Sequence, residues 1–122
     1  MSKILVVDDS ETLRSQLKKD LEQAGHTVME AYDGVNGLEI IQANKDTNLI
    51  LCDVNMPRMD GLTMCEKVRE IPELLKTPIF MLTTESNPEM KTRGKAAGVI
   101  AWITKPYVAA KLLVAIDKIT KS

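Results

Sequence analysis

Carboxylate, hydroxyl and ammonium side chains directly follow four short apolar runs of the sequence, at residues 4–7, 49–52, 78–82 and 100–103. The polar residues that follow these runs are Asp8, Asp9, Asp53, Thr83, Thr84, Thr104 and Lys105. If the runs are parallel strands, their carboxyl ends meet at one edge of a sheet, which is where open α/β folds bind ligands. We therefore expect these side chains to form one cluster.

Such a cluster suits phosphoryl transfer. Three ionised carboxylates repel one another, so a cation must compensate their charge. Because the cluster contains neither histidine nor cysteine, a hard divalent ion is expected, and Mg²⁺ typically combines one or two carboxylates with water and phosphate oxygens. Lys105 would add a second positive charge opposite a phosphate. An aspartate can then act as the nucleophile and form an acyl phosphate.

Taken singly, these residues have simpler explanations. An aspartate after a strand is often a turn residue. Asp8 and Asp9 could cap the helix that follows them, and Lys105-Pro106 could be an ordinary loop. Together, however, these explanations require polar groups to follow four strands of one sheet by chance. We therefore favour a single functional site formed by all of them.

Hydrophobic periodicity predicts the elements that position the cluster. Five apolar runs are expected to form strands, at 4–7, 27–31, 49–52, 78–82 and 100–103. Three of them are almost continuous in aliphatic residues, which is typical of strands buried on both faces of a parallel sheet. Segments with helical spacing separate the runs, so the pattern is β-α repeated five times. Right-handed crossovers then place helices on both faces, giving a doubly wound α/β fold.

Apolar spacing, caps and glycines predict the helices. The first helix should end near Gly25 and the fourth, which Asn87 would cap, at Gly98. Asp60 is expected to cap the third. The fourth is predicted to be weakly anchored, because Gly94 lies inside it and an interior glycine costs about 1 kcal/mol relative to alanine. The buried faces of the first and last helices are expected to carry Leu13, Leu17 and Leu21, and Val108, Leu112, Ile116 and Ile119, respectively.

The composition is that of one globular domain. With 122 residues, 44% of them hydrophobic, the chain is expected to form a single domain over residues 1–122 without an attached effector module. A formal net charge of −1 provides no basic field for nucleic acid. No membrane-spanning run or signal peptide is visible, and Cys52 and Cys65 lack metal-site or disulfide spacing. We expect a cytoplasmic protein with reduced, packed thiols and neither a nucleic-acid nor a membrane partner.

The order of these motifs resembles that of response-regulator receiver domains. The matching residues are Asp8-Asp9, the segment 53–61 (Asp-Val-Asn-Met-Pro-Arg-Met-Asp-Gly), Thr83 and Lys105-Pro106. Each motif alone is weak, but together and in this order they are highly specific, and the resemblance covers the full chain. It implies a flavodoxin-like, three-layer (βα)5 sandwich with a five-stranded parallel sheet of strand order 2-1-3-4-5.

The resemblance implies a role for each carboxylate. Asp53 would accept a phosphoryl group from a phosphohistidine on a CheA-like sensor histidine kinase. Mg²⁺ would be bound by Asp9, Asp53 and the backbone carbonyl of Asn55, with Asp8 acting through a water molecule. A receiver domain is not a conventional enzyme, but it promotes its own phosphorylation and dephosphorylation.

The resemblance also implies which residues bind the phosphoryl group, namely Thr83, Thr84, Lys105 and Asn55. Lys105 would pair with its oxygens and precede a cis bond to Pro106. Thr83 would move its hydroxyl towards the phosphoryl group. Thr84 stands where the family usually has a smaller residue, so its methyl group could crowd the phosphoryl group or its hydroxyl could bond to it.

Receiver domains also carry an aromatic switch residue three positions before the lysine. Here that residue is Trp102, where the family usually has tyrosine or phenylalanine. When Thr83 moves inward, the ring is expected to turn from exposed to buried, so that a local change in charge alters the surface. A ring that simply packs on the last strand is the alternative.

Within the family, the sequence is most similar to single-domain chemotaxis regulators, which it matches at Asn55 and Glu85. This similarity implies that the output partner is a FliM-like flagellar motor switch protein, bound on the surface of the fourth helix, fifth strand and fifth helix. The residues expected on that surface are Lys91, Lys95, Trp102, Tyr107 and Lys118. A phosphatase is a further expected partner, and a monomer is the expected oligomeric state.

Other functions remain open from the sequence. A phosphorelay intermediate would use the same site but bind mainly through its first helix, and another single-domain receiver could act on a non-motor target. An aspartate-based phosphatase normally needs a second acid two residues after the nucleophile, where this chain has Asn55. A flavin-binding electron carrier needs a phosphate-binding loop after the first strand, where Asp8 and Asp9 would repel phosphate.

Overall fold

The computed structural model describes residues 2–84 and 87–120, and strands and helices alternate along them. The strands are β1 (Lys3–Val7), β2 (Thr27–Ala31), β3 (Leu49–Cys52), β4 (Ile79–Thr83) and β5 (Val99–Thr104). The helices are α1 (Glu11–Gln23), α2 (Gly34–Gln42), α3 (Gly61–Val68), α4 (Pro88–Ala96) and α5 (Ala109–Thr120), with a short 3₁₀ turn, η1 (Pro72–Leu74), before β4. All five predicted strands are present, with boundaries that differ by one residue or none.

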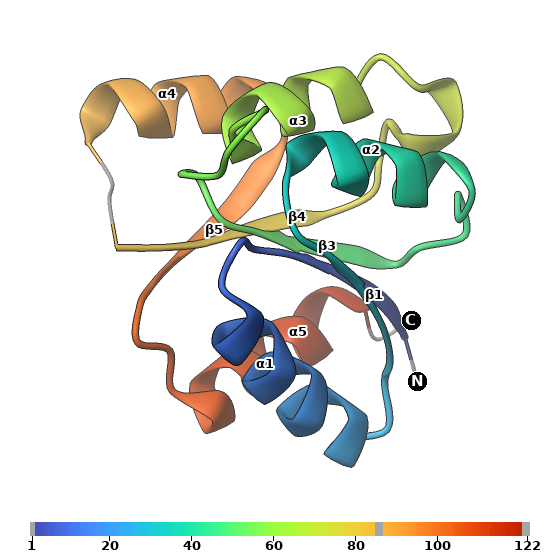
Figure 1. Cartoon of the computed structure of the whole chain (residues 1–122), viewed down its shortest axis with the longest axis vertical. Coiled ribbons are helices and arrows are strands. Elements are labelled where there is room, and N and C mark those ends of the chain that lie inside the picture. The colour runs from blue at the N-terminus through green and yellow to red at the C-terminus, as the bar shows by residue number, and fades with distance from the viewer. Residues whose placement is uncertain (1, 85–86, 121–122) are drawn as a thin grey trace.

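The sheet is parallel throughout, with the order β2-β1-β3-β4-β5. Helices α2, α3 and α4 cover one face, and α1 and α5 cover the other (Figure 1). This is the predicted doubly wound, three-layer α/β fold. Val7 at the end of β1 pairs with Cys52 at the end of β3, and Thr83 pairs with Thr104 across β4 and β5. The residues that follow these strands therefore meet at one edge of the sheet.

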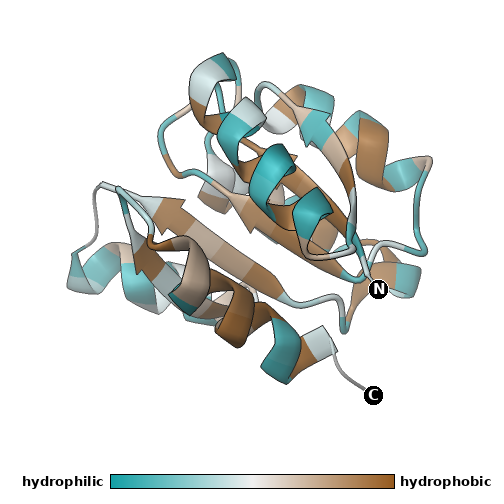
Figure 2. Cartoon of the chain, turned by 90° about the horizontal axis from the view of Figure 1, so that it is seen from below, coloured by the Kyte–Doolittle hydropathy of each residue, from teal (hydrophilic) through white to brown (hydrophobic). Residues whose placement is uncertain are grey.

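Both faces of the sheet are buried, which explains why the strands are continuously apolar. On β1, Leu5 and Val7 pack towards α2 and α3, whereas Ile4 and Val6 pack towards α1 and α5, and none of the four is more than 1% exposed. Figure 2 shows this arrangement as hydrophobic strands in the middle of the molecule, between helices that alternate hydrophobic and hydrophilic residues. Among the described residues, no helix is both long enough and apolar enough to cross a membrane.

The helix boundaries follow from local chemistry. Asp60 and Asn87 accept backbone hydrogen bonds from the third residue after them, so both predicted N-caps are confirmed. Helix α1 is capped by Ser10, not by Asp8 or Asp9, which removes the simplest explanation for the acidic pair. Beyond the ends of α1 and α4, Gly25 and Gly98 adopt left-handed backbone conformations, with φ of 96° and 86°.

One residue predicted to be buried in the last helix is not. Val108 is 55% exposed and precedes the first residue of α5, so the helix begins one residue later than its apolar spacing suggests. The other residues predicted for that face do pack against the core: Leu112 and Ile116 are fully or almost fully buried, and Ile119 is partly buried.

Candidate functional site

The carboxyl ends of β1 and β3 bring three aspartates together. Asp8 and Asp9 directly follow β1, Asp53 directly follows β3, and one carboxylate oxygen from each lies within 4.8 Å of the others. The adjacent strands set this geometry, since the N–H of Asp53 donates to the carbonyl of Val7 at 2.9 Å. Asp8 and Asp53 are buried, at 2% and 7% exposed, whereas Asp9 faces solvent. The cluster expected from the sequence is therefore present.

Lys105 reaches this cluster from the end of β5. Its Nζ lies 2.7 Å from Oδ2 of Asp8 and 3.3 Å from Oδ2 of Asp53. The backbone N–H of Lys105 donates to the carbonyl of Thr83 at 3.0 Å, which places the lysine beside the end of β4. The bond between Lys105 and Pro106 is cis, as predicted.

The electrostatics of the cluster favour an additional cation. Burial raises the pKa of Asp53 above its ordinary value, and the charge of Asp8 raises it further, although Lys105 and the N–H of Val54 act in the opposite direction. Burial lowers the pKa of Lys105, but its hydrogen bond to Asp8 and the charges of both aspartates outweigh burial and raise it. The protonated lysine therefore compensates only part of the negative charge. The remaining charge and the all-oxygen donor set fit a hard divalent ion.

The other predicted phosphate-binding residues lie along the same edge of the sheet. Thr83 is the last residue of β4 and is 4% exposed, and Thr84, which follows it, is exposed. Asn55 is exposed in the loop between β3 and α3, two residues after Asp53. Glu85, the second match to the chemotaxis type, lies outside the described residues.

Two residues that support the cluster were not predicted from the sequence. The guanidinium of Arg14 in α1 donates from Nη1 to the carbonyl of Asp8 at 2.6 Å, and its Nε lies 3.4 Å from Oε1 of Glu30 on β2. Gly61, the first residue of α3, lies against Asp53, because a Cβ at position 61 would overlap the carbonyl oxygen of Asp53. The sequence contains no signal for Arg14, whereas Gly61 is part of the segment that carries the family resemblance.

The five residues predicted for the partner surface do not all share one surface. Lys91, Lys95 and Trp102 line a groove of about 500 Å³ between α4 and β5. Tyr107 instead packs with the α1 and α5 side of the core, and its hydroxyl donates to Oδ2 of Asp20 in α1 at 2.6 Å. A half-buried phenol requires such a partner for its hydroxyl. Lys118 is exposed on the last turn of α5.

Trp102 packs against α4 at a glycine. The ring is half-buried, and a Cβ added to Gly94 would lie 2.6 Å from its Cζ2 atom. From the sequence, Gly94 was expected only to weaken the helix. In the structure it is buried, so it also has a packing role. Its missing side chain leaves room for an indole where the family usually has a smaller ring.

We expect Gly94→Ala to displace Trp102 from α4. The added methyl group needs space that the indole occupies, and alanine also favours the helix, so the ring rather than the helix should move. Trp102 is the only tryptophan, so its emission should shift to longer wavelength and its quenching by acrylamide should increase. Thr92→Ala, at an exposed position of α4 that does not line the groove, serves as the control. An unchanged spectrum in Gly94→Ala would show that the ring does not depend on this space.

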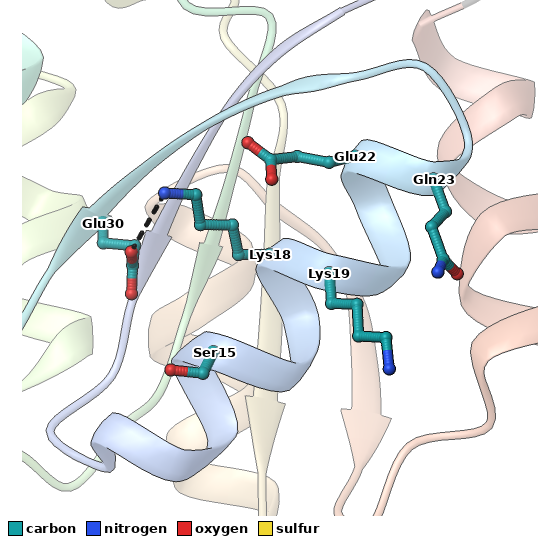
Figure 3. A pocket seen from close by; sticks show the side chains of 6 residues that line it. All are labelled: Ser15, Lys18, Lys19, Glu22, Gln23 and Glu30. Atoms are coloured by element: carbon teal, nitrogen blue, oxygen red, sulfur yellow. Dashed lines mark ion pairs between the residues drawn. The ribbon is translucent and has the colours of Figure 1, made fainter.

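A groove of about 540 Å³ lies elsewhere, along α1 (Figure 3). It is lined by Ser15, Lys18, Lys19, Glu22, Gln23 and Glu30. Lys18 and Glu30 form a partly exposed ion pair across it at 3.7 Å. The groove contains none of the predicted site residues, and its two lysines balance its two glutamates. The acidic cluster at the strand ends is therefore the better candidate for the functional site.

The fold and the acidic centre together define a flavodoxin-like α/β domain with three aspartates clustered at its strand ends. A model of the response regulator receiver domain matches residues 4–117, so the chain belongs to the receiver-domain family. Proteins of this family act in two-component signalling and are not conventional enzymes.

Several known relatives of the chain are chemotaxis proteins. The chain is 42% identical over 106 residues to the chemotaxis protein CheY1 of Helicobacter pylori, which covers 86% of each chain. It is 40% identical over 106 residues to a chemotaxis protein CheY homolog of Campylobacter jejuni, covering 86% of this chain and 82% of that one. The crystallised chemotaxis protein CheY4 of Vibrio cholerae matches with a TM-score of 0.91 and 39% identity over 98% of both chains.

Proposed function

We propose that this protein is a phosphorylation-dependent switch of a two-component system, a cytoplasmic receiver domain over residues 1–122. Asp53 accepts a phosphoryl group from a CheA-like histidine kinase, and the phosphorylated protein binds an output partner. The observation that carries this proposal is the buried Asp53 carboxylate, held 3.3 Å from Lys105 and beside Asp8 and Asp9. A buried acid with a raised pKa, a lysine and further carboxylates at strand ends is typical of a reactive site rather than of a structural ion pair.

The proposed reaction is a simple displacement. An oxygen of the Asp53 carboxylate attacks the phosphorus of a phosphohistidine, the P–N bond breaks, and the imidazole nitrogen keeps the electron pair of that bond. The product is an acyl phosphate on Asp53. Lys105 pairs with the phosphoryl oxygens. The hydroxyls of Thr83 and Thr84 and the side chain of Asn55, which follow the same strand ends, are the further proposed contacts.

Asp8, Asp9, Asp53 and the backbone carbonyl of Asn55 would hold Mg²⁺ at this site. When bound, Mg²⁺ would reduce the repulsion between the carboxylate and the incoming phosphoryl group. Arg14 and the N–H of Ser10 support this role, because they fix the carbonyl and the Oδ1 atom of Asp8 at 2.6 and 2.8 Å. Asp8 is thereby oriented before a cation arrives.

A FliM-like flagellar motor switch protein is the proposed output partner. The relatives named above are chemotaxis proteins. The groove lined by Lys91, Lys95 and Trp102 combines two cationic residues with apolar surface, which suits an acidic, partly apolar peptide. Movement of Trp102 would change the shape of this groove, so that phosphorylation controls binding. A phosphatase is a further proposed partner, and the protein is proposed to be a monomer.

A pull-down from the lysate of the source cell tests this function. The bait is the protein treated with beryllofluoride and Mg²⁺, since beryllofluoride stands in for the phosphoryl group on Asp53, and the control bait is Asp53→Asn treated in the same way. We expect a flagellar switch component to bind only the activated wild type. Capture of a histidine-phosphotransfer protein instead would assign the protein to a phosphorelay, and capture of neither by the activated bait would contradict the motor assignment.

Mg²⁺ is expected to change the fluorescence of Trp102 over a millimolar titration. A cation that binds Asp8 and Asp53 should change the contacts of Lys105 with both carboxylates. Because Trp102 lies three residues before Lys105, on β5, this change should reach the ring. Asp9→Asn, which removes one exposed ligand, should shift the midpoint to higher concentration by roughly tenfold. Identical midpoints for the two proteins would argue against a cation at this cluster.

A further inference from the structure

The N-terminus of α2 and the loop between β3 and α3 meet through an ion pair. Asp33 accepts two hydrogen bonds from the guanidinium of Arg58, one from Nε at 2.6 Å and one from Nη2 at 3.2 Å. The side chain of Asp33 is 3% exposed, whereas that of Arg58 is 52% exposed. A two-pronged bond of this kind fixes both the position and the orientation of the guanidinium. The buried carboxylate therefore holds the loop at residue 58.

Asp33 is itself fixed by α2. Its Oδ1 accepts a hydrogen bond from the N–H of Asn36 at 2.8 Å, so Asp33 is the N-cap of the helix. The hydrogen bond from Arg58, together with this cap, keeps the pKa of Asp33 below its ordinary value despite burial. The N–H of Gly34 also donates to the carbonyl of Met59 at 3.2 Å, and a Cβ at Gly34 would lie 2.5 Å from that oxygen. The close approach of α2 to the loop thus requires a glycine.

The backbone of Arg58 adopts a conformation that needs support. Its φ is 64°, in the left-handed region, and it is the only non-glycine residue in the described part of the chain with a positive φ. Residues with a side chain avoid this region because the Cβ crowds the carbonyl oxygen. The guanidinium also lies 5.8 Å from the centroid of the Tyr32 ring, next to Asp33 in sequence. These contacts hold the loop in a shape that its backbone would not otherwise favour.

The loop held in this way belongs to the acidic centre. It begins at Asp53, contains Asn55 and ends where α3 begins at Gly61. Hydrogen bonds fix its ends, from the N–H of Asp53 to Val7 and from the N–H of Gly61 to the carbonyl of residue 54, both at 2.9 Å. The described polar contacts that tie residues 55–59 to another element are those with Asp33 and Gly34.

We infer that Asp33 and Arg58 are positioning residues for the phosphorylation site, whose ion pair holds the loop in the shape in which the carboxylate of Asp53 and the carbonyl of Asn55 bind one divalent cation together. The inference rests on the proposed function. It adds two residues, Asp33 and Arg58, that support the cation site without binding the cation themselves. Without the ion pair, residues 55–59 sample other conformations, and binding must reorder them. The affinity for the cation therefore falls, while the three carboxylates stay in place.

Mg²⁺ affinity in a double-mutant cycle tests this role. The variants are Arg58→Ala, Asp33→Asn and the double variant; asparagine keeps the capping oxygen at the start of α2. The matched control is Arg93→Ala, which removes a similar two-pronged pair between Arg93 and Glu66, on α4 and α3. The Kd for Mg²⁺ is read from Trp102 fluorescence, and the rate of phosphorylation by acetyl phosphate is read from intact mass at low and at saturating Mg²⁺. Thermal unfolding of each variant shows that it is folded.

Each single variant is expected to raise the Kd roughly tenfold, and the double variant no further, because all three remove the same contact. Saturating Mg²⁺ should restore most of the phosphorylation rate, which general damage to the fold would not allow. A Kd within about twofold of the wild type in Arg58→Ala, a multiplied effect in the double variant, or an equal loss in Arg93→Ala would overturn the inference. A wild type that neither responds to Mg²⁺ nor gains a phosphoryl group would overturn the proposed function as well.

Discussion

Replacing Asp53 with asparagine is expected to abolish phosphorylation by acetyl phosphate in the presence of Mg²⁺. The amide keeps the size of the side chain and can still accept the hydrogen bond that the N–H of Val54 donates to Oδ1 at 2.7 Å. It removes the anionic oxygen that attacks phosphorus, so the loss should be complete rather than partial. Intact mass spectrometry should show the mass of one added phosphoryl group on the wild type and none on Asp53→Asn.

Asp60→Asn is the matched control for this experiment. Asp60 belongs to the same loop, but its carboxylate caps α3 by accepting from the N–H of Thr63 at 2.8 Å, a role that asparagine performs equally well. This variant should be phosphorylated like the wild type. If Asp53→Asn still gained one phosphoryl mass, the acceptor would be another residue and the proposed reaction would be wrong.

Gly61→Ala is expected to reduce both stability and phosphorylation. The new Cβ would overlap the carbonyl oxygen of Asp53 and contact Sγ of Cys52 at 2.9 Å, and neither group is the free end of a flexible side chain. The loop that carries the phosphoacceptor must therefore shift. We expect the free energy of unfolding to fall by about 3 kcal/mol, at the upper end of single substitutions. Chemical denaturation measures this change, and intact mass follows the slower reaction with acetyl phosphate.

Lys67→Ala controls for the change to alanine, because Lys67 is exposed on the same helix. Its free energy of unfolding should stay within about 0.5 kcal/mol of the wild type. A Gly61→Ala variant as stable and as rapidly phosphorylated as the wild type would mean that α3 can move away from Asp53 at little cost, and Gly61 would not be a structural requirement of the site.

The features that could be predicted from the sequence are those with a local physical signature. Strands buried on both faces leave continuous apolar runs, and the capping residues Asp60 and Asn87 bond to N–H groups three residues away. The cluster of aspartates could be predicted because each one directly follows a strand, and parallel strands align their ends. Val108 was misplaced because it continues the spacing of the last helix although the helix begins one residue later.

The contacts that could not be predicted join residues far apart in sequence. Asp33 and Arg58 are 25 residues apart, and Tyr107 and Asp20 are 87 apart. A side chain that bonds across such a distance has no periodicity or spacing of its own, since the fold alone decides which polar groups meet. The resemblance placed Tyr107 on the partner surface but gave no sign that its hydroxyl donates to Asp20 in α1. The buried Gly94 shows the same limit, because a glycine inside a helix does not reveal which ring it accommodates.

Reductive trapping of the phosphorylated protein tests most directly whether Asp53 is a phosphoacceptor. Borohydride reduces the acyl phosphate of an aspartate to homoserine, which peptide mass spectrometry locates at a single position. After treatment with acetyl phosphate and Mg²⁺, we expect homoserine at position 53, and none when Mg²⁺ is replaced by a chelator. Phosphoryl incorporation without homoserine at position 53, or with homoserine at another aspartate, would contradict the proposed site.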